Sequence, residues 1–136
     1  MPTCSFPGRY ESLAQICAFI SGMAEKAGLS DSATYAVQLA VDEACSNIVE
    51  HSYGKEGIGD IQCTCEVDDG NLKIILQDQG RPFDLNVVPE PDRNAPLDEV
   101  KPGGAGLFLM RKLMDEVHFE FTSDRGNILT MIKRKG

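Results

Sequence analysis

Apolar residues recur at three- and four-residue steps over two stretches in the first half of the chain. This spacing predicts two amphipathic helices. The first is expected over residues 9–27, with Gly28 ending it, and the second over residues 32–52, with Ser30 or Asp31 as its N-cap. The predicted apolar face of the second helix is broad and comprises Tyr35, Val37, Leu39, Ala40, Val41, Ala44 and Ile48.

Alternation of apolar and polar residues predicts a sheet in the rest of the chain. Residues 61–67 and 72–78 alternate around the turn at residues 68–71 and predict a hairpin. The other expected elements are a short first strand near residues 3–6, a helix over 107–116, and strands over 117–121 and 128–132. This order favours an α+β fold, a two-layer α/β sandwich whose mixed, mostly antiparallel sheet carries its helices on one face.

All periodicity is lost between residues 82 and 102. Five of the seven prolines lie in this stretch, which disfavours a long helix or a central strand. A compact domain rarely carries about twenty such residues unless they form a lid or a binding loop. We therefore expect a lid over about residues 82–103 within a single domain spanning residues 1–136.

Composition narrows the classes of function. The chain has 136 residues with 13 Lys and Arg against 21 Asp and Glu, a formal net charge of −8. An acidic chain without a basic stripe is a poor candidate for direct nucleic-acid binding. No apolar run approaches the ~18 residues of a membrane span, and the N-terminus lacks the pattern of a signal peptide, so we expect a cytoplasmic protein without a membrane partner.

The five cysteines are expected to be reduced thiols. Cys63 and Cys65 stand two apart on a predicted strand, which merely places them on one face. A structural zinc site needs a second ligand pair, which the sequence lacks, so no zinc is expected. His51 and His118 are expected to be structural or exposed.

One polar ridge is expected on the second helix. Glu43, Asn47 and His51 stand at positions i, i+4 and i+8, which lie along one helix face. A carboxylate and a carboxamide four residues apart can hold Mg²⁺ or position a water or hydroxyl. Taken alone, the fragment is also explained by an ordinary polar helix face.

Two further segments carry candidate chemistry. Period two places Asp78 on the inward face of its strand, continuing an apolar row, and Gly80 would let backbone approach a ligand there. A plain strand-ending turn is the alternative reading. The glycine-rich run at residues 103–106 precedes a predicted helix, so its backbone N–H groups suit phosphate. It lacks the Gly-Lys-Ser/Thr of a phosphate loop, and no strand precedes it as in a dinucleotide fingerprint.

Together and in this order, the three segments resemble the N, G1 and G2 boxes of the GHKL (Bergerat-fold, histidine-kinase-like) ATPases. The segments are DEACSNIVEHSYG at residues 42–54, DQGRPFD at 78–84 and GGAGLFLM at 103–110. Within that superfamily the chain is similar to the RsbW/SpoIIAB-type anti-sigma factor serine kinases. Residues 126–133 resemble the closing strand of the family, so the resemblance covers nearly the whole chain.

The resemblance implies a role for each matching residue. Asn47 would ligate Mg²⁺ bridging the phosphates of ATP, and Glu43 would be the general base for the attacking hydroxyl. Asp78 would accept a hydrogen bond from the adenine amino group, with Gly80 allowing close approach and Thr130 assisting. The backbone donors to the phosphates would be Gly104, Ala105 and Gly106.

The family also implies the function. An ATP- and Mg²⁺-dependent serine/threonine protein kinase is expected, which phosphorylates a STAS-type anti-sigma antagonist, sequesters a sigma factor, or does both. A homodimer is a further expected partner, although the first strand, which often serves dimerisation in the family, is short here. Ala105 stands where many relatives carry Arg or another larger residue. The alternatives are a nucleotide-gated protein-binding module without phosphotransfer and a regulatory domain that no longer binds ATP.

Overall fold

The structure, a computed structural model, describes residues 2–81 and 104–134. The expected lid at 82–103, including Gly103, lies outside these residues. The elements, in chain order, are β1 (Thr3–Pro7), the 3₁₀ turn η1 (Tyr10–Ser12), α1 (Leu13–Ala27), α2 (Asp31–Asn47), the π-helical segment η2 (Ile48–Tyr53), β2 (Asp60–Asp68), β3 (Asn71–Asp78), α3 (Gly104–Leu113), β4 (Glu116–Thr122) and β5 (Gly126–Lys133).

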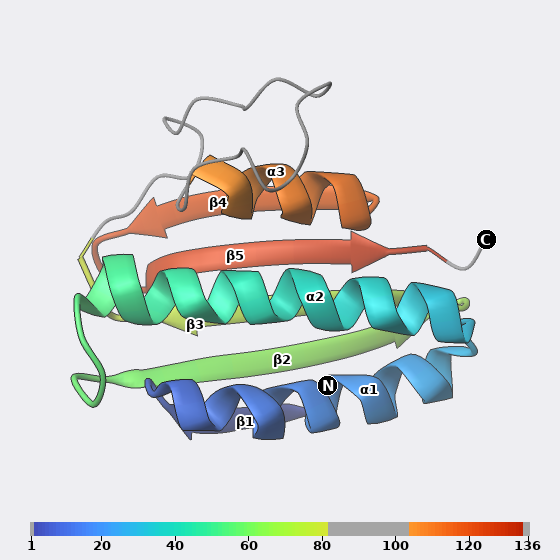
Figure 1. Ribbon diagram of the computed structural model, residues 1–136, viewed down its shortest axis with the longest axis horizontal. Helices are drawn as coiled ribbons and strands as arrows, with labels where there is room; N and C mark the ends of the chain where they lie inside the picture. The colour runs from blue at the N-terminus through green and yellow to red at the C-terminus, as the bar shows by residue number, and fades with distance from the viewer. Residues whose placement is uncertain (1, 82–103, 135–136) are drawn as a thin grey trace.

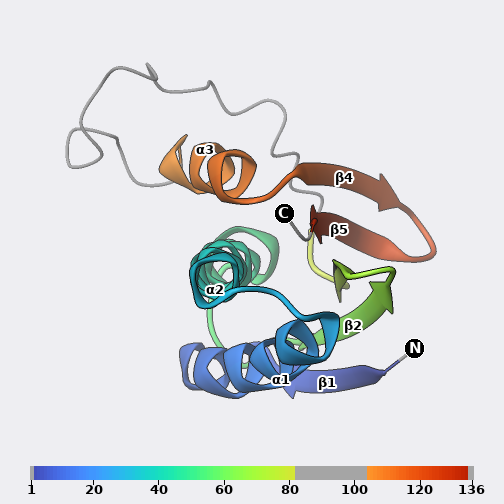
Figure 2. The same ribbon diagram turned by 90° about the vertical axis from the view of Figure 1, so that its right-hand side faces the viewer.

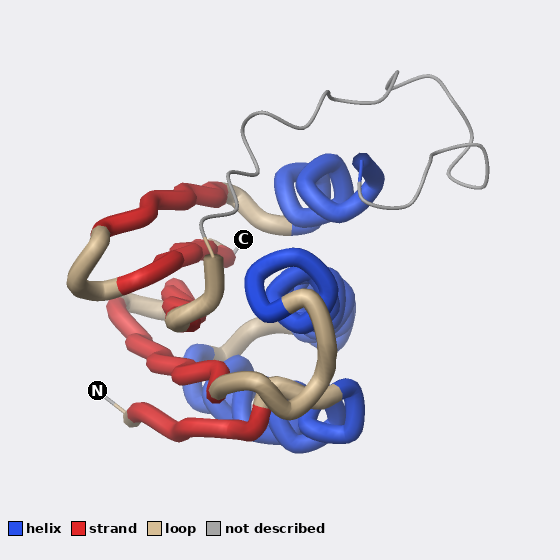
Figure 3. The backbone as a smooth tube through the Cα atoms, turned by 90° about the vertical axis from the view of Figure 1, so that its left-hand side faces the viewer, coloured by secondary structure: helices blue, strands red, loops and turns tan. Residues whose placement is uncertain are grey.

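The five strands form one sheet in the order β1-β2-β3-β5-β4, and each neighbouring pair is antiparallel. The three α-helices lie together on one face of this sheet, which makes two layers (Figures 1 and 2). Coloured by element type, the backbone shows the same separation of helices from strands (Figure 3). The expected α+β sandwich is confirmed. In residues 2–81 and 104–134, no helix has the length and apolar character needed to cross a membrane.

Local signals explain the helix ends between α1 and α2. Gly28 closes α1 in the left-handed region at φ 79°, which favours glycine because it has no Cβ. The Ser30 hydroxyl then accepts a hydrogen bond from the Ala33 N–H at 3.1 Å and caps α2. Both predicted caps are confirmed.

The core lies between the sheet and the helices. Alternate residues of two inner strands point into it and are buried, namely Ile61, Cys63 and Cys65 of β2 and Leu72, Ile74 and Leu76 of β3, whereas Val67 at the end of β2 is 37% exposed. Asp78 continues the β3 row at 2% exposure. The predicted face of α2 is too broad, because Tyr35 is 62% exposed and Leu39 is 39% exposed. The residues of α2 that do reach the core are Val37, Ala40, Val41, Ala44 and Cys45.

Two element boundaries differ from the predicted ones. Regular α2 stops at Asn47, and the remaining turn winds as the wider π-helix η2, which ends at Gly54 with φ 83°. The third helix begins at Gly104 instead of residue 107 and ends at Leu113. Its end is set by the sheet, because the Asp115 N–H donates to the Ile132 carbonyl of β5 at 2.9 Å.

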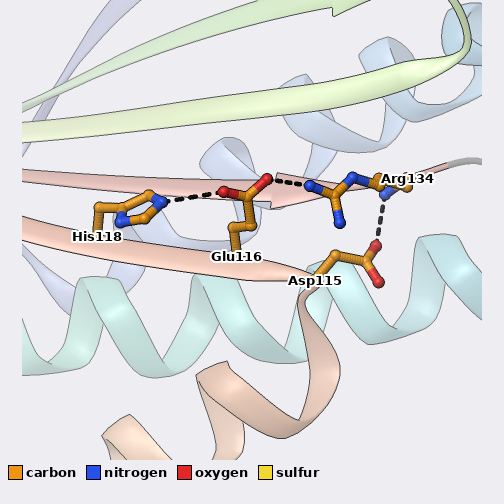
Figure 4. Close-up of polar contacts among 4 residues, drawn as sticks. All are labelled: Asp115, Glu116, His118 and Arg134. Atoms are coloured by element: carbon orange, nitrogen blue, oxygen red, sulfur yellow. Dashed lines mark hydrogen bonds and ion pairs between the residues drawn. The ribbon is translucent and has the colours of Figure 1, made fainter.

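Polar contacts link the start of β4 to the residue that follows β5, at the end of this hairpin away from its turn (Figure 4). The Arg134 backbone N–H donates to the Asp115 carboxylate at 2.6 Å, and its guanidinium pairs with Glu116. The other carboxylate oxygen of Glu116 lies 3.1 Å from Nε2 of His118. Together with the hydrogen bond from the Lys133 ammonium to the Leu113 carbonyl at 2.7 Å, these contacts hold the end of α3 against the hairpin.

Candidate functional site

Asp78, the last residue of β3, is a carboxylate buried at the edge of the core. Its Oδ1 accepts hydrogen bonds from the Gly80 N–H at 2.9 Å and from the Asn127 carboxamide at 3.0 Å. Burial raises the pKa of this carboxyl, while the hydrogen bonds from Asn127, Gly80 and Ser52 act to lower the pKa. Asp78 is therefore a positioned acceptor, as its inward phase predicts.

Gly80 permits a close backbone approach beside Asp78. A Cβ added to it would lie 2.5 Å from both the carbonyl carbon and the oxygen of Ser52. The next residue, Arg81, donates its N–H to that same oxygen at 2.8 Å. Only glycine fits this position without displacing η2, so the turn after β3 is packed directly against the end of the α2 segment.

Asn127 is a site residue that the sequence reasoning missed. It is the register partner of Asp78 on β5 and is only 2% exposed. Its Nδ2 lies within hydrogen-bonding distance of Asp78 Oδ1, of the Arg81 carbonyl oxygen at 2.9 Å and of the Ser52 hydroxyl at 3.3 Å. It thereby links three segments: β5, η2 and the turn after β3. A polar residue just after Gly126 at the start of an apolar strand was the available signal.

Thr130 does not join this group. Its register partner on β3 is Ile75, whereas Asp78 pairs with Asn127. Side chains alternate between the two faces of a strand, so Thr130 lies on the face opposite to Asp78 and Asn127. The structure therefore does not bring Thr130 to the predicted nucleotide site, and Asn127 occupies that place.

Asn47, on the last turn of α2, faces the same space as Asp78. It is 5% exposed, and within the described part of the chain its Nδ2 is buried without a hydrogen-bond partner. Such a group costs about 1–3 kcal/mol unless a ligand or water satisfies it. A small cavity joins it to the β-strand residues, and its lining consists of Ala44, Asn47, Ile48, Ser52, Asp78, Phe119, Asn127 and Leu129.

Glu43 lies one turn before Asn47 on α2 and is half-buried. Burial raises the pKa of its carboxyl, and the negative charges of Glu50 and Asp42 raise the pKa further. A carboxylate with a raised pKa is a better proton acceptor near neutral pH. His51 does not continue this ridge into the cavity, because η2 intervenes, and its carbonyl oxygen accepts from Arg81 Nε at 2.6 Å.

The glycine-rich segment begins α3. Gly104, Ala105 and Gly106 are its first three residues, and α3 packs against α2. The first four N–H groups of a helix have no partner within it, so this end offers donors and a positive dipole to an anion. Within residues 2–81 and 104–134, no group of three or more His, Cys, Asp or Glu side chains is placed to hold a metal ion.

Comparison with known proteins gives a consistent result. The family model described as a histidine kinase-like ATPase domain matches residues 6–133. The serine-protein kinase RsbW of Halalkalibacterium halodurans is 34% identical over 131 residues, covering 93% of this chain and 78% of the relative. RsbW of Staphylococcus epidermidis is 36% identical over 133 residues, covering 93% of this chain and 82% of the relative.

Two solved structures share the fold at 17% identity. The RsbU and RsbW domains of a Mycobacterium tuberculosis protein align with a TM-score of 0.63, covering 98% of this chain and 32% of that one. The histidine kinase domain of a blue-light activated kinase from Erythrobacter litoralis aligns with a TM-score of 0.54, covering 96% of this chain and 62% of that one.

Proposed function

Because the chain belongs to the histidine kinase-like ATPase domain family, we propose that it is an ATP- and Mg²⁺-dependent serine/threonine protein kinase of the anti-sigma type. One observation carries the proposal. The unpartnered amide of Asn47 and the buried carboxylate of Asp78 line the same cavity, although they come from different layers of the fold. Four of its eight lining residues are polar (Asn47, Ser52, Asp78 and Asn127), and in this proposal the small cavity is the inner end of the nucleotide site.

Asp78 binds the base in this proposal. Its carboxylate accepts a hydrogen bond from the exocyclic amino group of adenine, which guanine does not present in the same place. Asn127 holds Asp78 in position through the 3.0 Å hydrogen bond, and Gly80 leaves room for the ligand beside the backbone. A base without this amino group leaves the buried Asp78 carboxylate without a donor. Such a base should therefore bind more weakly than adenine.

Asn47 fits a Mg²⁺ site on chemical grounds. Mg²⁺ prefers oxygen ligands and commonly takes only one or two from the protein, with the remainder from water and substrate phosphates. The carboxamide oxygen Oδ1 of Asn47 would be the single protein ligand, and its buried, unpartnered Nδ2 would donate to a phosphate or water oxygen. When bound, the ion neutralises charge on the phosphates.

Glu43 is the proposed general base. The hydroxyl oxygen of the acceptor attacks the terminal phosphorus of ATP, the bond to the bridging oxygen breaks, and ADP leaves while Glu43 takes the hydroxyl proton. Its raised pKa favours this proton transfer. The first turn of α3, from Gly104 to Gly106, donates backbone N–H groups to the phosphates, so no lysine is required there.

The proposed acceptor is a serine of another protein, because the relatives are named serine-protein kinases. Serine-protein kinases named RsbW are 31–36% identical to this chain. We propose a STAS-type anti-sigma antagonist as the phosphoacceptor and a sigma factor as the protein that the chain sequesters. The acidic net charge of −8 suits a protein that acts on regulators instead of on DNA.

Phosphotransfer tests the proposal directly. The protein is incubated with labelled ATP, Mg²⁺ and candidate STAS-domain proteins, and label on the acceptor is measured. Glu43→Gln should abolish transfer while Mg·ATP binding by calorimetry is retained. Glu25→Gln, an identical charge change at an exposed position on α1, is the matched control and should transfer normally. Nucleotide binding without labelling of any acceptor would instead favour a nucleotide-gated binding module.

A further inference from the structure

Four of the five cysteines lie on β1, β2 and the C-terminal part of α2, and none of them lines the small cavity beside Asn47 and Asp78. Cys4 lies on β1, Cys63 and Cys65 on β2, and Cys45 on α2. All are free thiols, and Cys4 is exposed while the other three are fully buried. The proposed kinase mechanism uses none of them, so the cluster needs a separate explanation.

The strand register places Cys4 directly opposite Cys63. On the preceding pair, the Thr3 and Thr64 hydroxyls lie 3.0 Å apart on the face of the sheet that carries no helices. Because side chains alternate along a strand, Cys4 and Cys63 share the opposite face, toward the helices. The two thiols therefore start on the same side of adjacent strands, with no residue between them.

The Cα separation of this pair lies within the range of disulfides, whereas its Cβ separation of up to about 5.5 Å exceeds their range of about 3.5–4.5 Å, so the edge strand β1 must shift toward β2 as the bond forms. The Cys65 N–H donates to the Pro2 carbonyl at 3.0 Å, so Pro2 and Cys65 form a hydrogen-bonded pair, and by alternation so do Cys4 and Cys63. Cα atoms in such pairs lie about 5.5 Å apart. Disulfides span about 4.4–6.8 Å between Cα atoms. Cys65 is diagonal to Cys4, at about 7–8 Å, which is too far.

The three thiols also differ in their chemistry. The Cys63 thiol donates a hydrogen bond to the Cys65 sulfur, which raises the pKa of Cys63 and lowers the pKa of Cys65. Both of these residues are shielded from solvent, whereas Cys4 on the edge strand is open to it. An oxidant in solution therefore meets Cys4 first, and Cys63 is the thiol within reach of the product.

We propose that Cys4 and Cys63 form a reversible redox-modification site, in which a peroxide converts the two thiols into a cross-strand disulfide. The Cys4 thiol gives up its proton, its sulfur attacks one oxygen of hydrogen peroxide, and the O–O bond breaks; a sulfenic acid forms, and the leaving hydroxide takes the Cys4 proton as the first water. The Cys63 sulfur then attacks the Cys4 sulfur, the S–O bond breaks, and the leaving hydroxide takes the Cys63 proton as a second water. Two electrons pass from the thiols to the peroxide.

The product ties the outer strand β1 to β2. An edge strand is held to the sheet on one side only, so it is among the first parts to open. A covalent link between Cys4 and Cys63 prevents that opening and restricts the unfolded chain over the intervening residues. Oxidation should therefore raise the thermal midpoint, and a thiol reductant should return it to its starting value.

The test uses the full chain, reduced, freed of reductant and then treated with hydrogen peroxide. The expected result is a fall from five free thiols to three, a mass loss of about 2 Da, and a peptide map that links Cys4 to Cys63. Cys4→Ser should remove the link, and Cys63→Ala is a second variant that should do the same. Cys17→Ser, which keeps a donor toward Asp42, is the control and should still form it.

Three results would overturn the proposal. The first is a link between Cys63 and Cys65, and the second is an intermolecular link between Cys4 residues of two chains. The third is Cys4 oxidised to sulfinic or sulfonic acid with Cys63 still free. Each is resolved by non-reducing electrophoresis and peptide mass, and none depends on kinase activity.

Discussion

Asn127→Ala removes a side chain that links three segments: β5, η2 and the turn after β3. The hydrogen bond to Asp78 involves an ionised acceptor, for which the net contribution is about 1.5–3 kcal/mol. The Arg81 carbonyl, which also loses its donor, adds about 0.5–1.5 kcal/mol. Because Asn127 is only 2% exposed, water cannot simply replace it. We expect a loss of about 2–4.5 kcal/mol in the free energy of unfolding.

The loss should depend on pH in a defined direction. Burial already holds the pKa of Asp78 above its ordinary value of 3.8, and removing the Asn127 donor raises the pKa further. A raised pKa means that protonation stabilises the folded state, and the variant gains more from it than the wild type does. The full cost is therefore expected well above the Asp78 pKa, and it should shrink as pH falls toward that pKa.

Urea unfolding followed by circular dichroism measures the effect, since the chain has no Trp for fluorescence. A double-mutant cycle with Asp78→Asn isolates the coupling, which we expect to be at least about 1 kcal/mol at neutral pH. A cost below about 0.5 kcal/mol, or one that does not shrink as the pH is lowered toward the pKa of Asp78, would refute the reasoning. An unchanged m-value is needed for the comparison to hold.

Three further predictions concern single residues of the site. Asn47→Ala should remove the Mg²⁺ dependence of ATP affinity, measured by calorimetry with and without a chelator, and an unchanged dependence would exclude the metal role. Gly80→Ala should lower the free energy of unfolding by about 1–3 kcal/mol, because its Cβ would lie 2.5 Å from neighbouring backbone. Gly22→Ala in α1, with nothing within 4 Å, is the control and should stabilise by about 0.5–1 kcal/mol. Phosphotransfer should fall as pH falls through the pKa of Glu43, at a pH above the ordinary 4.5. A rate independent of Glu43 protonation would contradict that role.

The position of Asp78 was predictable because it depends only on local alternation. Residues 72, 74 and 76 are apolar and fully inward, so period two alone places Asp78 on the buried face. The cap at Gly28 was predictable for the same reason, since its φ of 79° is a local requirement. The three sequence boxes then indicated the family, which the match over residues 6–133 confirms.

The phase of β5 could not be predicted in this way. Its residues 128, 129, 131 and 132 are all apolar, as is common in a strand inside a sheet, so alternation does not say which face Thr130 takes. The pairing of β5 with β3 decides which face each residue takes, and it places Asn127 opposite Asp78. The π-helical turn of η2 could not be predicted from the sequence either, because Ile48 and Val49 continue the apolar pattern of an ordinary helix.

The placement of β3 beside β5 has a topological consequence. Asp78 and Asn127 are 49 residues apart in the chain, and their hydrogen bond closes a loop that contains residues 82–103, α3 and β4. The entropy of closing a loop grows only slowly, by about 0.6 kcal/mol for each doubling of its length. Insertions within 82–103 should therefore leave the Asp78–Asn127 pair intact. The length of the segment between β3 and α3 can thus vary while the contact between β3 and β5 stays the same.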